Sequence, residues 1–489
     1  MTLKRLHRVE LLAVLIIVIV LGVTAVNQTI AQTPQGAAPS GPFCRFGVNA
    51  LEDPAQTNLP AYNIGWYMNF TAHAVPSKPN SMEYMPTIRI QPSQNNAGYT
   101  YTPSGTALTT TIAGNPGAKW LISNEPDSIW QDNLTPERYA NAYHELYYLI
   151  KTADPTAKII AGNIIQATAL RLQYMDAILT TYYNNFNEPF PTDGWSIHNY
   201  ILSEVDCNFF PPEYCWGAFI PPGSTAISGE IWQYKDHDRL DIFTERIVRF
   251  RQWLADRGYG GQPVYLTEYG ILFPALYHDE NGQYFDAPRV KNFMTATFDY
   301  LNSATDTKLG DPNDGYRLVQ QWSWFSTTDP NYNGMLFESP APYTPTVFIS
   351  HYGNYTSQLA PEVDFYPSKV EGFGVSTGTA VTVTVSATIA NSGNLVNNSG
   401  ATVTFYNGDP QNGGSIIGTP QTIQLNGCGS NQTISIQWPN LPPGTHTIYV
   451  QVTPDSGVTE TNTTNNTVSG TVLVATEQIY LPAIQRGLP

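Results

Sequence analysis

One stretch of the chain is decisive for its fold, and it reads Lys119-Trp120-Leu121-Ile122-Ser123-Asn124-Glu125-Pro126-Asp127. A short apolar run bounded by turn-forming residues is typical of a buried strand in a parallel sheet. The run Pro263-Val264-Tyr265-Leu266-Thr267-Glu268-Tyr269-Gly270 has the same pattern. Each stretch therefore predicts a strand that carries a glutamate, Glu125 or Glu268, at its C-terminal end.

Further segments of this kind alternate with helical stretches up to about residue 358, which is the rhythm of a parallel sheet covered by helices. Thr135 and Pro136 predict the start of a helix that continues over 138–152, and Gly258 ends another over 242–257. Eight strands predict closure into a (β/α)8 TIM barrel. The expected strands are 44–49, 64–68, 86–90, 120–123, 158–162, 194–197, 264–267 and 318–322.

The pattern changes past residue 360, where Val and Thr alternate with period two, as in 381–385. Turns such as Asn407-Gly408 separate these runs, and helical patterns vanish. We therefore predict a C-terminal Ig-like β-sandwich. The expected order is an N-terminal signal or anchor (1–31), a linker (32–42), the barrel (43–358), the β-sandwich (366–475) and a tail (476–489).

The N-terminus predicts export. Lys4 and Arg5 precede an apolar stretch over 11–26, and a small-residue cleavage site follows near Ala31. The favoured interpretation is a cleaved signal peptide and a secreted or extracellular protein, and the alternative is an uncleaved helix that holds the protein at the membrane. In an oxidising compartment four cysteines can pair in three ways, and only the short loop Cys207–Cys215 is predicted.

The charge balance excludes one class of partner. A formal net charge of -16 with only 23 Lys and Arg argues against nucleic acid, because phosphate binding needs clustered cations. The 10 Trp, 30 Tyr and 20 Phe suit a surface that handles sugars, although core packing accounts for more than half of such residues. A neutral polymer is a compatible partner.

Two carboxylates at the mouth of one barrel point to glycosidic-bond hydrolysis. Catalytic groups of such barrels sit at the C-terminal ends of the strands. One carboxyl group protonates the leaving oxygen, while the other attacks the anomeric carbon or activates water. The chain has no P-loop, zinc-type His-Glu-x-x-His, nucleophile elbow or Cys-x-x-Cys pair. We therefore expect a hydrolase without cofactor or metal, acting as a monomer on a polysaccharide or oligosaccharide.

The pairing of these two motifs resembles the large clan of retaining (β/α)8 glycoside hydrolases that includes cellulases, mannanases, β-xylosidases and β-1,3-glucanases, over about residues 43–358. The resemblance implies that Glu125 is the acid/base, Glu268 the nucleophile and Asn124 a donor to the sugar's 2-hydroxyl. Because a general acid must be protonated, Glu125 is expected to have the raised pKa. The segments at 65–67 and 85–86 are most similar to a glycosyl hydrolase catalytic-core family with β-1,3-glucanase members.

The same resemblance implies further substrate-site residues. His198 and Tyr200 would orient and polarise Glu268, and Trp324 would form the floor of the subsite for the attacked sugar. Arg89 would hold Glu268 ionised if it points inward, and an outer-surface salt bridge is the alternative.

Sugar and linkage depend on loops that the sequence does not describe. These loops are expected around tryptophans that include Trp66, which we also place in the substrate site; the others are Trp130, Trp195, Trp216 and Trp232.

Two motifs are rejected. Glu188 lies in a second Asn-Glu-Pro tripeptide, but it precedes a strand instead of following one. The segment 329–334 begins like a calcium loop, yet Pro340 stands where a bidentate Glu is needed.

Beyond the barrel, residues 460–462 and 465–466 resemble the closing strands of the bacterial adhesion-related Ig-like domain. This module could attach to a cell-surface polymer. The rival hypothesis for the whole chain is a non-catalytic carbohydrate-binding or adhesion protein, but both glutamates are present, which favours an enzyme.

Overall fold

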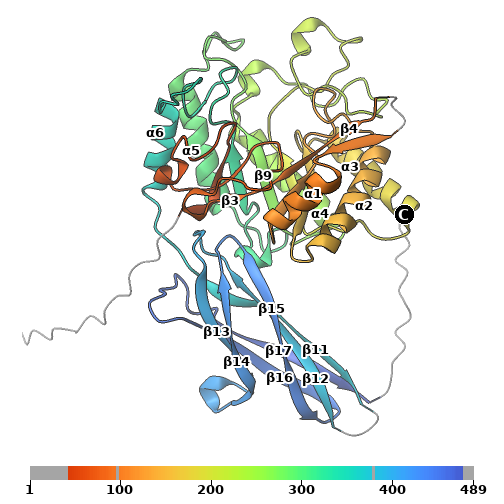
Figure 1. Ribbon diagram of the computed structural model, residues 1–489, viewed down its shortest axis with the longest axis vertical. Helices are drawn as coiled ribbons and strands as arrows, with labels where there is room; N and C mark the ends of the chain where they lie inside the picture. The colour runs from red at the N-terminus through yellow and green to blue at the C-terminus, as the bar shows by residue number, and fades with distance from the viewer. Residues whose placement is uncertain (1–41, 95–97, 377–379, 477–489) are drawn as a thin grey trace, which may run out of the picture.

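The computed structural model describes residues 42–94, 98–376 and 380–476, and Figure 1 shows two domains stacked end to end. The first contains a sheet surrounded by helices, and the second consists of long strands. The expected signal or anchor segment, most of the linker and nearly all of the tail lie outside the described residues. Within the described residues, no helix has both the length and the apolar character needed to cross a membrane.

The first domain is built on a sheet with the strand order β3-β2-β1-β10-β9-β8-β7-β6-β4-β5. All neighbouring strands are parallel except the edge pair β4 and β5. The strands are β1 (Phe43–Asn49), β2 (Ile64–Met68), β3 (Glu83–Tyr84), β4 (Thr87–Pro92), β5 (Tyr99–Thr102), β6 (Lys119–Ile122), β7 (Lys158–Ile164), β8 (Gly194–His198), β9 (Val264–Tyr269) and β10 (Gln321–Trp324).

The two ends of this sheet meet in one stretch of chain. β3 pairs with β2 and β4 pairs with β6, and only Met85 and Pro86 separate β3 from β4. The Met85 N–H donates to the carbonyl of Tyr67 on one side at 3.0 Å, and the Leu121 N–H donates to the carbonyl of Pro86 on the other at 2.9 Å. The sheet therefore curls round on itself. The break between β3 and β4 falls at Pro86, which has no N–H to donate.

The helices cover the outside of the curl, but they are fewer than a regular eightfold repeat requires. The connections β1–β2 and β2–β3 contain 3-10 turns, Leu59–Tyr62 and Pro79–Ser81, and no α-helix. The structure thus agrees with the expected α/β fold class, but it does not show the regular (β/α)8 repeat. The α-helices are α1 (Gly105–Gly114), α2 (Pro136–Ala153), α3 (Ala169–Phe186), α4 (Leu240–Asp256), α5 (Ala287–Ser303) and α6 (Val347–Thr356).

Local sequence signals explain why some helices begin where they do. Pro136 opens α2, and the Thr135 side chain caps it by accepting a hydrogen bond from the Arg138 N–H. The expected last strand, 318–322, is displaced to Gln321–Trp324. The buried Arg251 binds the Leu318 carbonyl and the Gln320 side chain, while the Gln320 N–H donates to the Val264 carbonyl of β9 just before the strand begins.

The second domain is a β-sandwich-like unit with the strand order β14-β13-β16-β17-β11-β12-β15. Neighbours are antiparallel except β11 and β17. The alternation seen in the sequence places Val383, Val385 and Ile389 of β12 in its core. The strands are β11 (Phe365–Val375), β12 (Val381–Asn391), β13 (Ser399–Asn407), β14 (Ser415–Leu425), β15 (Ser430–Leu441), β16 (Gly444–Pro454) and β17 (Thr467–Ala475).

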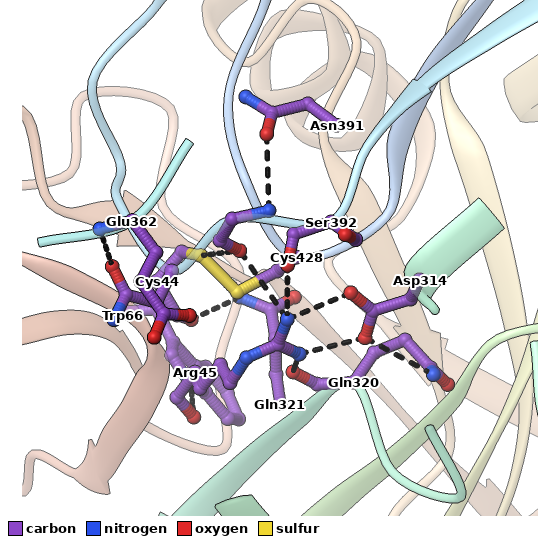
Figure 2. Close-up of a disulfide and its surroundings, with 12 residues drawn as sticks. Cys44, Arg45, Trp66, Asp314, Gln320, Gln321, Glu362, Asn391, Ser392 and Cys428 are labelled. Carbon is purple, nitrogen blue, oxygen red and sulfur yellow. Dashed lines mark hydrogen bonds and ion pairs between the residues drawn. A yellow bond between two sulfur atoms is a disulfide. The ribbon is translucent and has the colours of Figure 1, made fainter. Parts of the chain in front are cut away.

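A disulfide joins the two domains at the start of β1 (Figure 2). Cys44 is bonded to Cys428, which lies 384 residues later in the chain. The Cys44 N–H also donates to the Asn394 carbonyl at 2.9 Å, so the first strand of one domain is hydrogen-bonded to a loop of the other. Cys207–Cys215, the pairing that we expected, is present as well.

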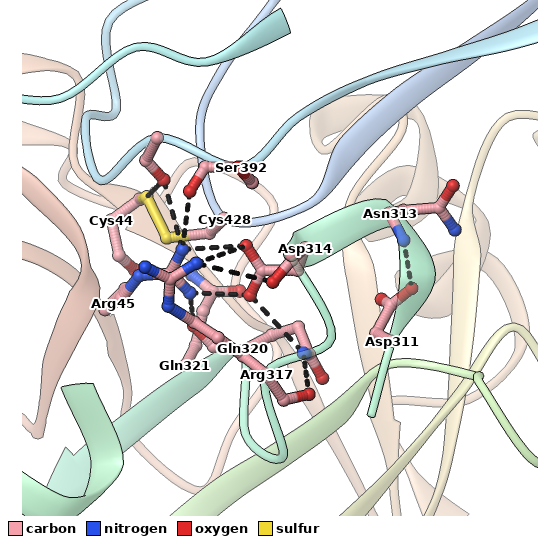
Figure 3. A network of polar contacts seen from close by, with 12 residues as sticks. Cys44, Arg45, Asp311, Asn313, Asp314, Arg317, Gln320, Gln321, Ser392 and Cys428 are labelled. Atoms are coloured by element: carbon pink, nitrogen blue, oxygen red, sulfur yellow. Dashed lines mark hydrogen bonds and ion pairs between the residues drawn. A yellow bond between two sulfur atoms is a disulfide. The ribbon is translucent and has the colours of Figure 1, made fainter. Parts of the chain in front are cut away.

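Arg45, the next residue, forms a buried ion pair at the same junction (Figure 3). Its guanidinium binds both carboxylate oxygens of Asp314, at 2.6 and 2.7 Å. It also donates to the carbonyls of Ser392 and Gly393 in the second domain. A buried charge with few partners is costly, whereas this guanidinium is bidentate and hydrogen-bonded on both sides of the junction. The contact therefore fixes how the two domains meet.

Because the Cys44–Cys428 bridge closes a far longer loop than Cys207–Cys215, its removal should destabilise the protein more. We expect the double variant Cys44→Ser/Cys428→Ser to lose roughly 2–5 kcal/mol of unfolding free energy. The variant Cys207→Ser/Cys215→Ser is the control and should lose less. Thermal unfolding under non-reducing conditions measures both, and equal losses would contradict the structural role of the junction.

Candidate active site

A cavity of about 390 Å³ opens at the C-terminal ends of the parallel strands. Glu125 follows β6 and Glu268 lies at the end of β9, and both line this cavity. The two carboxylates predicted from separate strand motifs are therefore brought together. Both side chains are largely buried, at 6% and 8% exposure of the residue.

His198, the last residue of β8, lies next to both carboxylates. Its Nδ1 is 2.9 Å from Oε1 of Glu125 and 3.7 Å from Oε2 of Glu268. One oxygen of each glutamate and this nitrogen lie within 4.8 Å of one another. The prediction placed His198 beside Glu268, whereas its hydrogen bond is to Glu125. The ring thus connects the two glutamates.

Tyr200 is found where the prediction put it. Its hydroxyl donates a hydrogen bond of 2.8 Å to Oε1 of Glu268, and its side chain lines the same cavity. A donor favours the ionised form of the carboxylate that accepts from it.

The pKa of Glu268 is raised to about 7, chiefly by burial. The charge of Glu125 also raises it, while His198, Tyr200 and Arg89 lower it. Burial acts to lower the pKa of His198, but the charges of Glu268 and Glu125 outweigh burial and raise it. Glu268 therefore holds a proton more tightly than usual, since burial disfavours its charged form. The expectation of a raised pKa at Glu125 stays a prediction.

Arg89 points inward, which decides between the two alternatives. It lines the cavity, and its Nε pairs with the buried Asp132 at 2.7 Å. Asn124 is buried beside it, with its Oδ1 lacking any partner among the described residues. A buried polar atom without a partner that belongs to a cavity-lining residue is suited to receive a ligand hydroxyl.

Two predicted tryptophans do not reach the cavity. Trp66 is fully buried inside the curl of the sheet, where its Nε1 donates to the Arg45 carbonyl. Trp324 is fully buried on the opposite side of the sheet, where it packs edge-on against Tyr269 and donates to the Gly334 carbonyl. Both assignments were wrong. Trp324 occupies the other face of its strand, which a fully buried strand does not reveal in sequence, and Trp66 lies on the inner face but in the middle of β2, where it does not line the cavity.

Other aromatic residues line the cavity instead. Phe325, which directly follows Trp324, packs edge-on against Tyr332, and Phe70 lies across from it. At the rim, Trp130 is 71% exposed and rests edge-on against Phe219. Only Trp130 had been singled out in the sequence, and the end-of-strand rule applied one residue further would have selected Phe325.

The two motifs that the sequence analysis rejected, around Glu188 and Asp329, gain no catalytic or metal-binding role from the structure. Glu188 follows α3, away from the cavity, where it accepts hydrogen bonds from Tyr148 and Tyr182. Asp329 lines the cavity, and its carboxylate accepts from the Asn331 N–H in a local turn.

Among the described residues, Glu125, His198 and Glu268 form the group whose spacing could hold a metal ion. Carboxylate and imidazole are common ligands of divalent metals. The same three side chains already satisfy one another by hydrogen bonding and charge, so the arrangement needs no ion. The expectation of a metal-free site stays a prediction.

Comparison with known proteins gives two family matches. Residues 46–209 match the family model described as glycosyl hydrolase catalytic core, and residues 364–470 match CARDB, which agrees with the expected adhesion-related Ig-like module. Searching curated proteins finds no significant match.

Several solved structures are similar at low identity. An endo-β-1,3-glucanase of glycoside hydrolase family 128 from Sorangium cellulosum is 14% identical, with a TM-score of 0.37, over 64% of this chain and 98% of that one. A curdlan-specific exo-β-1,3-glucanase from Blastomyces gilchristii is 16% identical, with a TM-score of 0.38, over 63% and 97%. The CARDB domain of a Pyrococcus furiosus protein is 20% identical, with a TM-score of 0.19, over 24% and 96%. The family models cover residues 46–209 of the first domain and 364–470 of the second.

Replacing Tyr200 by Phe should raise the pKa of Glu268 further above its ordinary value. The lost hydrogen bond favours the ionised carboxylate by roughly 1.5–3 kcal/mol, as is usual for bonds to charged groups. A ¹³C NMR titration of the glutamate carboxyl signals measures the shift, with Glu268→Gln used to assign the resonance. Tyr183→Phe, a change at a half-exposed tyrosine on α3, is the control and should leave it unmoved. An unchanged or lowered pKa in Tyr200→Phe would contradict this account.

Proposed function

We propose that this protein, whose residues 46–209 match the model of a glycosyl hydrolase catalytic core, is a retaining glycosidase that hydrolyses a β-linked polysaccharide or oligosaccharide. The reaction would proceed by double displacement through a glycosyl-enzyme. One observation carries this proposal, the close approach of Glu125 and Glu268.

Carboxylate spacing separates the two hydrolytic mechanisms. Retaining enzymes hold their carboxyl groups about 5–5.5 Å apart, whereas inverting enzymes need about 6.5–9.5 Å to fit a water molecule. Glu125 and Glu268 each place an oxygen within 4.8 Å of the other, which supports the shorter, retaining spacing. The spacing supports direct attack by one of the two carboxylates.

The contacts support one division of roles. Glu268 accepts from Tyr200 and is influenced by Arg89, and both favour the ionised form that a nucleophile needs. Glu125 exchanges a hydrogen bond with His198, whose raised pKa lets it hold a proton beside the acid. We therefore assign Glu268 as nucleophile and Glu125 as acid/base.

In the first step, Glu268 attacks the anomeric carbon, the glycosidic bond breaks, and Glu125 gives its proton to the leaving oxygen. In the second step, Glu125 takes a proton from water, and the water oxygen displaces Glu268 from the sugar. Each residue ends the cycle as it began. Because the free Glu268 has a pKa of about 7 and must be ionised, kcat/KM should rise with pH on its acid side through this region.

The cavity lining supports an uncharged sugar as substrate. Phe70, Phe325, Tyr332 and the exposed Trp130 offer apolar faces on which sugar rings can stack. Asn124 beside them offers hydrogen-bonding groups to hydroxyls. A panel of β-glucans, with β-1,3-glucan first, then mannans and xylans, identifies the sugar and linkage.

The finer architecture and the setting belong to the same proposal. We take the curled sheet as a variant of the (β/α)8 barrel. We take the protein as a monomer whose β-sandwich attaches it to a cell-surface polymer. Export as a secreted or membrane-held protein is supported by the N-terminal sequence and by the pairing of all four cysteines.

Azide rescue tests the two roles. In Glu268→Ala, azide attacks from the vacated face and should give an inverted glycosyl azide. In Glu125→Ala, a substrate with a good leaving group still forms the glycosyl-enzyme, and azide should give the retained product. Without azide, each variant should lose about 10²–10⁴-fold in kcat/KM on a polysaccharide. The anomeric configuration of the products is read by NMR.

Glu188→Ala is the matched control, because it changes the glutamate of the other Asn-Glu-Pro tripeptide, and it should keep full activity. Exchanged product configurations would reverse the assignment of Glu125 and Glu268. Full activity in either active-site variant would remove that glutamate from the mechanism.

A further inference from the structure

Asp132 is a fully buried carboxylate that the reaction itself does not use. It lies in the loop after β6, and its Oδ2 accepts from the Ile90 N–H at 3.0 Å, the Ser123 hydroxyl at 2.7 Å and the Asn124 N–H at 2.8 Å. Its Oδ1 pairs with Nε of Arg89 at 2.7 Å. All four partners are donors and favour the ionised carboxylate, which only accepts, although burial outweighs them and raises the pKa of Asp132.

The turn that Asp132 holds has an unfavourable backbone conformation. Ser123 has φ of 73° and Glu125 has φ of 44°, which places both in the left-handed region. Residues other than glycine stay there only where their surroundings hold them. Asn163 holds the turn from the β7 side, since its carbonyl accepts from the Glu125 N–H and its side chain donates to the Ser123 carbonyl. Asp132 holds it from the β4 side.

We propose that Asp132 is a positioning residue that sets both the Asn124–Glu125 turn and the Arg89 guanidinium against the substrate. The inference rests on the proposed function. Asp132 would touch no substrate. It contacts both β4 and the turn after β6, and these two segments form one wall of the cavity.

Charge gives this role a distinct signature. Arg89 lowers the pKa of Glu268, and the negative charge of Asp132 partly neutralises Arg89. In Asp132→Asn, the negative charge that partly neutralises Arg89 is gone, so Arg89 should lower the pKa of Glu268 more strongly. The acid side of the kcat/KM profile should then move to lower pH. The other groups that act on Glu268 or feel its charge are Glu125, His198, Tyr200 and Tyr332. The charge of Asp132 is itself felt by the buried tyrosines Tyr139 and Tyr174.

The experiment compares Asp132→Asn with Asp314→Asn in the full-length chain. Asp314 is the matched control, because it is also a buried partner of an arginine but lies at the domain junction. We expect Asp132→Asn to lose about 100-fold in kcat/KM, mainly in kcat, since misplacing catalytic groups by about 1 Å costs this much. Its acid limb should move to lower pH. Asp314→Asn should lower the Tm and leave the pH profile in place.

Arg89→Gln covers the case in which Asp132→Asn does not fold. It removes the cation instead of the anion, so the acid limb should move in the opposite direction, to higher pH. Normal kinetics in Asp132→Asn, or a loss that follows its Tm with an unmoved pH profile, would overturn the proposal, as would an unmoved limb in Arg89→Gln. Failure of the proposed function is distinct, because the wild-type protein would then be inactive or indifferent to Glu125→Ala and Glu268→Ala.

Discussion

Two carboxylates within 4.8 Å of each other, both largely withdrawn from water, are the arrangement on which the rest of the site depends. Like charges at that distance repel, and burial disfavours each charge separately. His198 lies next to both carboxylates and offsets their repulsion. Tyr200 donates a hydrogen bond to Glu268, and the charge of Arg89 also stabilises its ionised form. Burial and the charge of Glu125 outweigh these three groups, so the pKa of Glu268 is raised.

The parallel sheet makes this arrangement attainable. Strands that run in the same direction bring their C-terminal ends to one mouth, so residues far apart in sequence become neighbours. Glu125, His198 and Glu268 each come from the end of a different strand, β6, β8 and β9. Two other residues hold the turn before Glu125. Asp132 comes from the loop after β6, and Asn163 comes from β7.

Sequence patterns predicted the features that depend on strand ends and failed for those that depend on side-chain direction. Glu125 and Glu268 follow from the rule that catalytic groups sit at the C-terminal ends of strands, and Tyr200 follows from the family resemblance. Trp324 was misplaced because a fully buried strand shows no alternation from which an inner and an outer face can be read, and Trp66 because it lies in the middle of β2. The role of Asp132 required loop geometry, which no periodicity describes. Likewise, the Cys44–Cys428 bridge spans too much chain for spacing to suggest it.

That bridge also bears on the order in which the protein can be completed. A chain is synthesised from its N-terminus, and its domains generally fold as units in that order. Cys44 and Arg45 lie in β1, yet their partners in the second domain, near residues 392–394 and 428, come more than three hundred residues later. The start of β1 therefore stays uncovered while the rest of the first domain is made. It becomes covered only when the β-sandwich has been synthesised and folded, so the later domain completes the earlier one.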